Sequence, residues 1–168
     1  SGRIELYSET IEGFGYDDCP PHPAWLEPAE WLGSVSEYPL HMISNQPKTR
    51  LHSQWDHGET SLDSKIDGRE RIGMHPEDAS ARDLDEGALV RVFNARGACL
   101  AAVAIRADLM PGVVQLPTGA WWDPVEPGGL CRAGNPNVLT RDVGTSHLAQ
   151  GPSAQTCLVE VERHVGDP

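Results

Sequence analysis

Residues 89–105 are the feature that most narrows the folds open to this chain. The run from Leu89 to Asn94 predicts a strand, because β-branched and aromatic residues favour a pleated surface. Arg96-Gly97 then supplies a turn, and the apolar run from Ala98 to Ile105 returns as a second strand. The sequence therefore predicts a β-hairpin in the middle of the chain.

Further strands are predicted on both sides of this hairpin, over residues 3–8, 40–44, 113–116 and 156–161. Pro76 and the two acids after it predict a short helix, since proline suits the first helical position and acids suit the positive helix end. That helix has to end by the Asp85-Glu86-Gly87 turn. The sum is an all-β domain with one or two short helices.

Two long stretches lack periodicity, residues 9–37 and residues 118–156. The first is rich in proline yet carries several aromatic side chains, so we expect an extended arm packed on a larger body. Residues 59–70, which include Lys65, are polar and are predicted to form a flexible surface loop. Long loops inside a compact domain are usually functional or disordered, and the polar excursions are therefore the places to look for a site.

Charge and length exclude several classes of protein. A chain of 168 residues is expected to form one domain with a proper core. The net charge of −12 argues against a nucleic-acid partner, because phosphate backbones are bound by basic faces. No apolar run approaches the roughly 20 residues of a membrane helix, so no membrane partner is expected. An anionic small molecule needs only a local cluster of donors and remains possible.

The four cysteines, at positions 19, 99, 131 and 157, form no C-x-x-C pair, so a closed zinc site is not expected. Their even number permits two disulfides, but a domain of this size does not need them. We therefore expect free, buried thiols. No metal-ligating and no catalytic residue is assigned.

The polar segment from Ser44 to Gln54 is the first candidate for binding. It carries neutral hydrogen-bonding groups at Ser44, Asn45, Gln46, Thr49, Ser53 and Gln54. Lys48, Arg50 and His52 alternate with them, which places three donors on one side of an extended segment. Such a face suits an anionic pyrophosphate or the edge of a pterin ring, and the forked guanidinium of Arg50 is the best single candidate. The alternative is an ordinary solvated loop.

The second candidate lies between residues 118 and 156. Asn135-Pro136-Asn137 and Gln155 offer side-chain amides, which both donate and accept and so suit base or pterin edges. Asn-Pro and Gly-rich turns are also ordinary turn chemistry, and that alternative stays open. Trp121-Trp122 could cover a ligand, although paired tryptophans more often pack in a core or an interface.

Five blocks in this order resemble the dinucleotide-binding domain of the dimethyl-sulfoxide reductase family, and are most similar to its biotin sulfoxide and trimethylamine-N-oxide reductases. The blocks are residues 38–54 (Tyr-Pro-Leu-His … Ser-Asn-Gln-Pro-Lys-Thr-Arg-Leu-His-Ser-Gln), 90–97, 119–124, 134–140 and 144–151. The arm at residues 13–20 resembles the segment that leads into that domain. The resemblance covers nearly the whole chain.

The resemblance implies a mainly β fold, a double-psi β-barrel of the aspartate-decarboxylase-like type with short helices and long loops. It implies an arm from a preceding domain over residues 1–37 and a cofactor-binding barrel over residues 38–168. The implied cofactor is a molybdenum atom held by two molybdopterin guanine dinucleotides, shared with other domains. The implied cofactor contacts are Ser44, Asn45, Gln46, Lys48, Arg50, His52, Ser53, Asn137 and Gln155.

The parent protein implied by the resemblance is an oxidoreductase that reduces S-oxides or N-oxides, with its metal-ligating serine and substrate pocket in preceding domains. Those domains and the cofactor are the expected partners, and the chain by itself is expected to bind rather than catalyse. A biotin-sulfoxide-reductase-like parent implies the cytoplasm, and a trimethylamine-N-oxide-reductase-like parent implies the periplasm. Two alternatives stay open: a stand-alone pterin-binding module or chaperone, and a self-processing decarboxylase that uses Gly33-Ser34.

Overall fold

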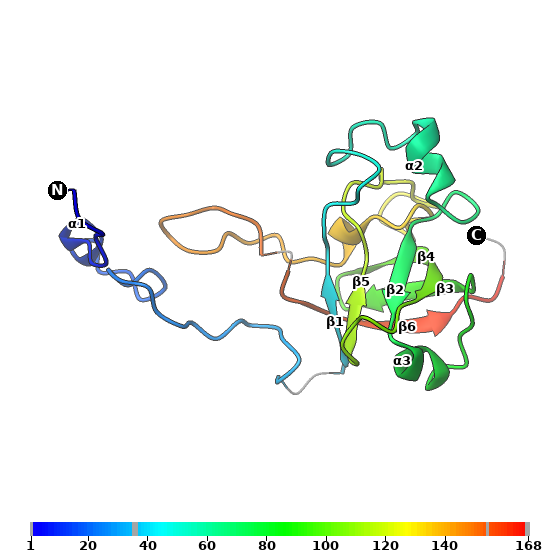
Figure 1. Cartoon of the computed structure of the whole chain (residues 1–168), viewed down its shortest axis with the longest axis horizontal. Coiled ribbons are helices and arrows are strands. Elements are labelled where there is room, and N and C mark those ends of the chain that lie inside the picture. The colour runs from blue at the N-terminus through cyan, green and yellow to red at the C-terminus, as the bar shows by residue number, and fades with distance from the viewer. Residues whose placement is uncertain (1, 35–36, 154, 167–168) are drawn as a thin grey trace.

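The computed structural model describes residues 2–34, 37–153 and 155–166. Within them, six strands close into a barrel in the order β1-β5-β2-β4-β3-β6 (Figure 1). The strands are β1 (Leu40–Ile43), β2 (Arg71–Met74), β3 (Leu89–Asn94), β4 (Gly97–Ile105), β5 (Val113–Gln115) and β6 (Cys157–Arg163). β1 pairs with β5 and β2 with β4 in parallel, and the other neighbours are antiparallel. This interlocked pairing confirms the predicted mainly β class and the double-psi barrel.

The core fills the inside of this barrel. The predicted hairpin is present as β3 and β4, in register from Leu89 opposite Ala102 to Asn94 opposite Gly97. Alternate residues of β3 are buried, so its period of two gives one inner and one outer face. Fully buried side chains from the strands meet inside, among them Met42, Ile72, Val92, Val103, Val114 and Val159.

The described residues also contain four short helices. α1 (Glu9–Glu12) lies in the arm before β1, and α2 (Glu59–Asp63), α3 (Pro76–Ser80) and the 3-10 turn η1 (Pro136–Val138) lie between strands. α3 begins at Pro76 as predicted, and the Nδ1 atom of His75 accepts a hydrogen bond from the Glu77 amide at 3.2 Å. In Figure 1, α2 and α3 lie at opposite ends of the barrel.

Three expectations differ from the structure. Residues 3–8 form no strand, because this part of the arm meets no strand partner in the described chain, and Ile4 remains 90% exposed. Residues 59–70 are not a flexible loop, because they contain α2 and end at Glu70, which is buried. β2 was not predicted, because it offers only two apolar side chains that alternate around Gly73.

The arm extends away from the barrel, and the loop over residues 140–153 extends toward the same side (Figure 1). The arm docks on the barrel through Glu30, whose carboxylate accepts hydrogen bonds from Arg96 at 2.7 and 2.9 Å and from the Leu158 amide at 2.9 Å. Burial pushes the pKa of Glu30 upward, but the bonds and charge of Arg96 and the Leu158 amide outweigh burial and leave the pKa lowered.

A second contact joins the arm to the loop over residues 140–153. The Asp18 carboxylate accepts a hydrogen bond from the His147 amide at 3.0 Å and lies 3.0 Å from the Nδ1 atom of the same residue. The Tyr16 ring stacks on the His147 ring with centroids 5.2 Å apart. Both segments therefore belong to one side of the molecule.

All four cysteines are free thiols, and Cys99, Cys131 and Cys157 are buried. Burial raises the pKa of the Cys99 and Cys157 thiols, although a hydrogen bond from Arg96 offsets part of the rise at Cys157. In the described residues, no helix is both long enough and apolar enough to cross a membrane.

Candidate functional site

The first polar segment folds back on itself instead of running straight. The Gln46 side-chain amide donates to the Arg50 carbonyl at 2.5 Å, and its oxygen accepts from the His52 amide at 3.0 Å. His52 and Trp55 both take positive φ values, 50° and 62°, which non-glycine residues rarely adopt. These bends close residues 46–55 into a compact loop.

This closure makes one sequence expectation wrong, namely that Lys48, Arg50 and His52 share a face. Alternation places side chains on one side only in an extended segment, and this one is a series of turns. Lys48 and His52 are exposed, whereas the side chain of Arg50 is fully buried.

Arg50 lies in a buried cluster of four charged groups beneath the loop. Its Nη1 atom lies 3.0 Å from Glu70 and 3.5 Å from Asp56, and Lys65 lies 3.3 Å from Glu70 and 2.7 Å from Asp56. Arg50 also donates to the Ser61 hydroxyl and the Thr118 carbonyl, at 3.1 and 2.8 Å. Two cations and two carboxylates balance, which is the condition under which buried charges are tolerated.

The cluster extends to the neighbouring loop through Asp56. Its second oxygen accepts a hydrogen bond from the Trp121 amide at 3.0 Å. Burial raises the pKa of Asp56, but the Lys65 bond, the Trp121 amide and the charges of Lys65 and Arg50 outweigh it, so the pKa is lowered. Asp56 therefore stays ionised and holds two loops together.

Gly119 lets those two loops approach closely. It has a φ of 97°, a conformation that glycine adopts without strain. A Cβ atom there would clash with the His52 carbonyl and lie 3.0 Å from the Arg50 Nε atom. The Trp121 indole then donates to the Ser53 carbonyl at 2.8 Å, which fixes the tryptophan beside the loop.

The Asn135–Asn137 turn approaches from the other side. The Asn135 side-chain oxygen caps η1 by accepting from the Asn137 amide at 2.9 Å. The carbonyl of Leu139, just after η1, accepts from the buried Asn94 amide at 2.9 Å and from Arg96 at 2.6 Å. The β3–β4 hairpin thus positions Asn137 at the edge of the barrel.

These elements enclose a hollow of about 510 Å³. It is lined by His52, Ser53, Thr118, Gly119, Ala120, Trp121, Trp122, Asn135 and Asn137. The hollow therefore brings together residues of the two polar segments, 44–54 and 118–156, that were candidates for binding from the sequence. Trp121 and Trp122 are each 54% exposed, so they line the hollow instead of packing in the core, which is the opposite of the more common behaviour of paired tryptophans.

Gln155 and Ser44 do not line this hollow but join the end of β1 to the segment that leads into β6. The Gln155 side chain accepts from the Ser44 amide at 3.0 Å and donates to the Ser44 carbonyl at 2.7 Å, as a neighbouring strand would. The next residue, Asn45, is tied to the second loop through its carbonyl, which accepts from the Thr118 amide at 3.0 Å. These bonds extend the barrel edge into the loop.

The polar groups around the hollow fit a heterocyclic ligand. The Asn137 amide, the His52 ring and the Ser53 hydroxyl make no side-chain hydrogen bond to any described residue, while the indole faces of Trp121 and Trp122 are partly exposed. Outside the lining of the hollow, the Asn45 Oδ1 atom is buried and has no hydrogen-bond partner in the described structure. Such groups need a ligand or water to complete their bonding.

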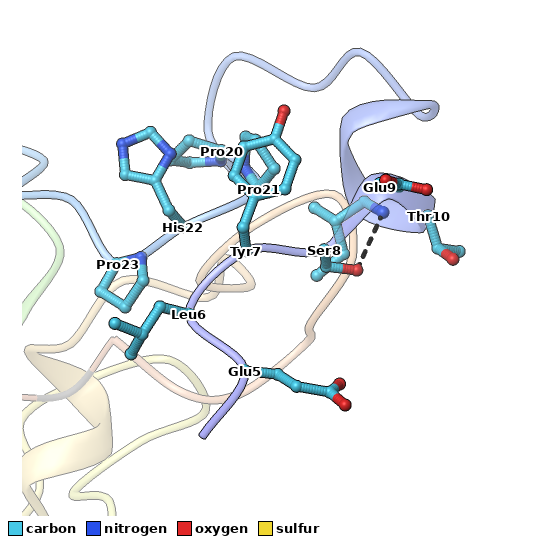
Figure 2. A pocket seen from close by; sticks show the side chains of 11 residues that line it. Glu5, Leu6, Tyr7, Ser8, Glu9, Thr10, Pro20, Pro21, His22 and Pro23 are labelled. Carbon is cyan, nitrogen blue, oxygen red and sulfur yellow. Dashed lines mark hydrogen bonds between the residues drawn. The ribbon is translucent and has the colours of Figure 1, made fainter. Parts of the chain in front are cut away.

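Other hollows and side-chain clusters of the described chain are weaker candidates for a binding site. A hollow of about 660 Å³ lies at the far end of the arm, and Figure 2 shows that its side chains come from two runs of the arm, residues 5–11 and 20–23. Tyr7 and His22 stack there with centroids 6.4 Å apart, and none of the predicted contact residues takes part. The described residues contain no group of three His, Cys, Asp or Glu side chains able to hold a metal ion.

Known proteins resemble this chain over most of its length. The family model described as "Molydopterin dinucleotide binding domain" matches residues 40–158. The chain is 54% identical to biotin sulfoxide reductase of Cereibacter sphaeroides over 99% of its length, and 50% identical to trimethylamine-N-oxide reductase 1 of Escherichia coli K12, also over 99%. It spans only about a fifth of those relatives, 22% and 20% of their lengths.

The fold is also found in a solved structure. Acetylene hydratase from Pelobacter acetylenicus superposes with a TM-score of 0.76 over 97% of this chain and 24% of its own, at 20% identity. At that identity the likeness shows the fold alone. The family resemblance read from the sequence is confirmed by the match over residues 40–158: the chain belongs to the family of molybdopterin dinucleotide-binding domains.

Proposed function

We propose that this chain is the C-terminal cofactor-binding domain of a molybdenum-dependent S-oxide or N-oxide reductase, and that it binds bis(molybdopterin guanine dinucleotide) together with other domains. The hollow between the 46–55 loop, Trp121-Trp122 and Asn137 carries this proposal, because it offers unpaired donors and aromatic faces to a heterocycle. The similarity to reductases over nearly the whole chain supports the activity of the parent protein.

Within this function, the chain's residues fall into two groups. His52, Ser53 and Asn137, which line the hollow, contact the cofactor, and so does the exposed Lys48 on the same loop. Ser44, Asn45, Gln46, Arg50 and Gln155 hold the loop that presents them. When bound, the molybdenum cofactor supplies two-electron chemistry, and the protein supplies orientation and hydrogen bonds. The reaction of the parent reduces an S–O or N–O group, and the oxygen leaves as water with two electrons and two protons.

The arm belongs to the same proposal. Large apolar side chains of the arm are exposed, with Trp25 79% and Leu6 68% exposed, which suits a segment that packs against other domains. We assign residues 1–37 to a segment covered by preceding domains of the parent, and residues 38–168 to the cofactor-binding barrel. A parent similar to biotin sulfoxide reductase places the chain in the cytoplasm, and one similar to trimethylamine-N-oxide reductase places it in the periplasm.

The test uses the full-length protein that carries this chain. Gly119→Ala is expected to lower molybdenum and pterin content per polypeptide severalfold, because the new methyl group displaces the His52 carbonyl at the wall of the hollow. Gly128→Ala is the matched control: Gly128 also has a positive φ, 77°, but a Cβ there meets nothing within 4 Å. Equal cofactor content in the two variants would contradict the assigned hollow, and cofactor-free full-length protein would contradict the proposed function.

A further inference from the structure

Three neighbouring hollows lie beside the barrel, and each shares lining residues with the next; we call this row of hollows the groove. The hollow at Trp121 shares Asn137 with a second hollow of about 590 Å³, which is lined by residues from Asn137 to Pro152. The second shares Arg141, Val143 and Gly144 with a third hollow of about 540 Å³ that also contacts arm residues Leu26 to Ala29. Arg141 stands at the junction of the second and third hollows.

The positive side chains of this acidic chain are mostly engaged elsewhere. Arg50 and Lys65 form ion pairs with Glu70 and Asp56 in the buried cluster. Six further arginines pair with carboxylates: Arg82, Arg91, Arg96, Arg106, Arg132 and Arg163. Arg141 is different, because within the described residues no hydrogen bond or ion pair engages its guanidinium. It influences Glu30 only through its charge, and Arg96 already neutralises that carboxylate.

The groove is otherwise negative where it is charged. Asp142 lines the second hollow and Glu27 lines the third. Among the described residues that line the three hollows, Arg141 is the one Lys or Arg. An anionic ligand in this groove therefore has one fixed cation to approach, and a guanidinium can bond two phosphate oxygens at once.

We propose that Arg141 binds the diphosphate of the dinucleotide cofactor, in the groove that continues from the Trp121 hollow past Asn137. This inference rests on the proposed function. From the sequence, Arg50 was expected to bind the pyrophosphate, whereas the structure points to Arg141, which no sequence motif had indicated. Arg50 is enclosed by its carboxylate partners and acts as a positioning residue. The guanidinium of Arg141 has no partner among the described residues and lines the groove.

The test measures binding of guanosine 5′-diphosphate, and of uncharged guanosine, to the intact 168-residue chain by titration calorimetry. The chain is expected to prefer the diphosphate, and Arg141→Gln to lose about ten- to a hundredfold in diphosphate affinity, as for one charge-assisted bond, with guanosine affinity unchanged. Arg71→Gln is the control, because Arg71 is exposed at the start of β2 and lines none of the three hollows. Asp142→Asn should act in the opposite direction and raise diphosphate affinity.

An Arg141→Gln variant that keeps the full preference for the diphosphate would overturn the assignment. So would an intact chain that binds no guanosine 5′-diphosphate while the full-length protein still contains molybdopterin, and that result would leave the proposed function standing. Full-length protein without molybdopterin would instead remove the proposed function itself.

Discussion

At the scale of single residues, the buried charges beneath the candidate site decide how its loop is held. Arg50→Met leaves Glu70 and Asp56 with one cation in place of two, in a site where all the side chains are at most 4% exposed. Breaking a buried ion pair by removing one partner costs about 3–5 kcal/mol. We therefore expect Arg50→Met to lower the free energy of unfolding by that amount, measured by urea denaturation.

The double variant Arg50→Met/Glu70→Met separates charge balance from packing. It removes one cation and one carboxylate together, so it should be more stable than Arg50→Met alone. Lys65→Met is not a neutral control, because Lys65 lies in the same cluster. Arg50→Met with unchanged stability would show that the cluster does not hold the loop.

The sequence alone does not show which of two similar arginines is buried. Arg50 and Arg141 are both arginines in polar, turn-rich segments, and nothing in their neighbours tells which is buried. Their roles differ because Asp56, Ser61, Lys65 and Glu70, between 6 and 20 residues further along the chain, fold back over Arg50. Such contacts arise from the tertiary fold and have no local signature.

At the scale of elements, the barrel strands with strong periodicity were predictable, whereas the alternation at residues 3–8 predicted a strand that the structure does not have. The β3–β4 hairpin and β6 follow from alternation and turn residues, because these signals act within a few positions. β2 was missed, since parallel pairing with β4 and not its own four-residue pattern makes it a strand. The two polar segments form loops, as predicted. Their geometry depends on Gly119, which lets the two loops approach each other, and on Gln46, which closes its own loop through bonds to Arg50 and His52.

The contact between the arm and β6 should depend on pH. The pKa of Glu30 is lowered in the folded chain from its ordinary value of 4.5, so its stabilising contribution is complete above that value. The contribution is lost as the pH falls through the lowered folded pKa, because protonation weakens the bonds from Arg96 and Leu158. The Leu158 amide resonance, followed by NMR from pH 7 to pH 2.5, is therefore expected to titrate with a midpoint below 4.5.

Glu30→Gln provides the comparison for this titration. Glutamine keeps the shape but cannot titrate, so the Leu158 transition should disappear in the variant while transitions of distant carboxylates, such as Asp108, remain. A Leu158 midpoint at or above 4.5 in the unmodified chain would contradict the predicted direction.

At the scale of the whole molecule, the barrel and the arm differ in how they are stabilised. The barrel closes on itself and has a continuous buried core, whereas the described residues of the arm add no side chain to that core. The contacts of the arm with the rest of the chain include the bonds of Glu30 to Arg96 and to the Leu158 amide, the approach of Leu32 to Gly112, and the Asp18–His147 and Tyr16–His147 contacts. Partly exposed ion pairs of this type contribute only about 0–1 kcal/mol each.

Removal of residues 1–37 should therefore leave a folded barrel. The shortened chain keeps Tyr38, whose ring packs edge-on against Phe93 at 6.2 Å, and keeps all six strands. A loss of about 1–2 kcal/mol corresponds to a fall of roughly 3–10 °C in Tm for a chain of this size, with one cooperative transition retained. Differential scanning calorimetry measures both quantities, and far-UV circular dichroism should remain dominated by β-structure. If the shortened chain instead unfolds without a cooperative transition, the arm is part of the barrel's folding unit and the boundary at residue 37 is misplaced.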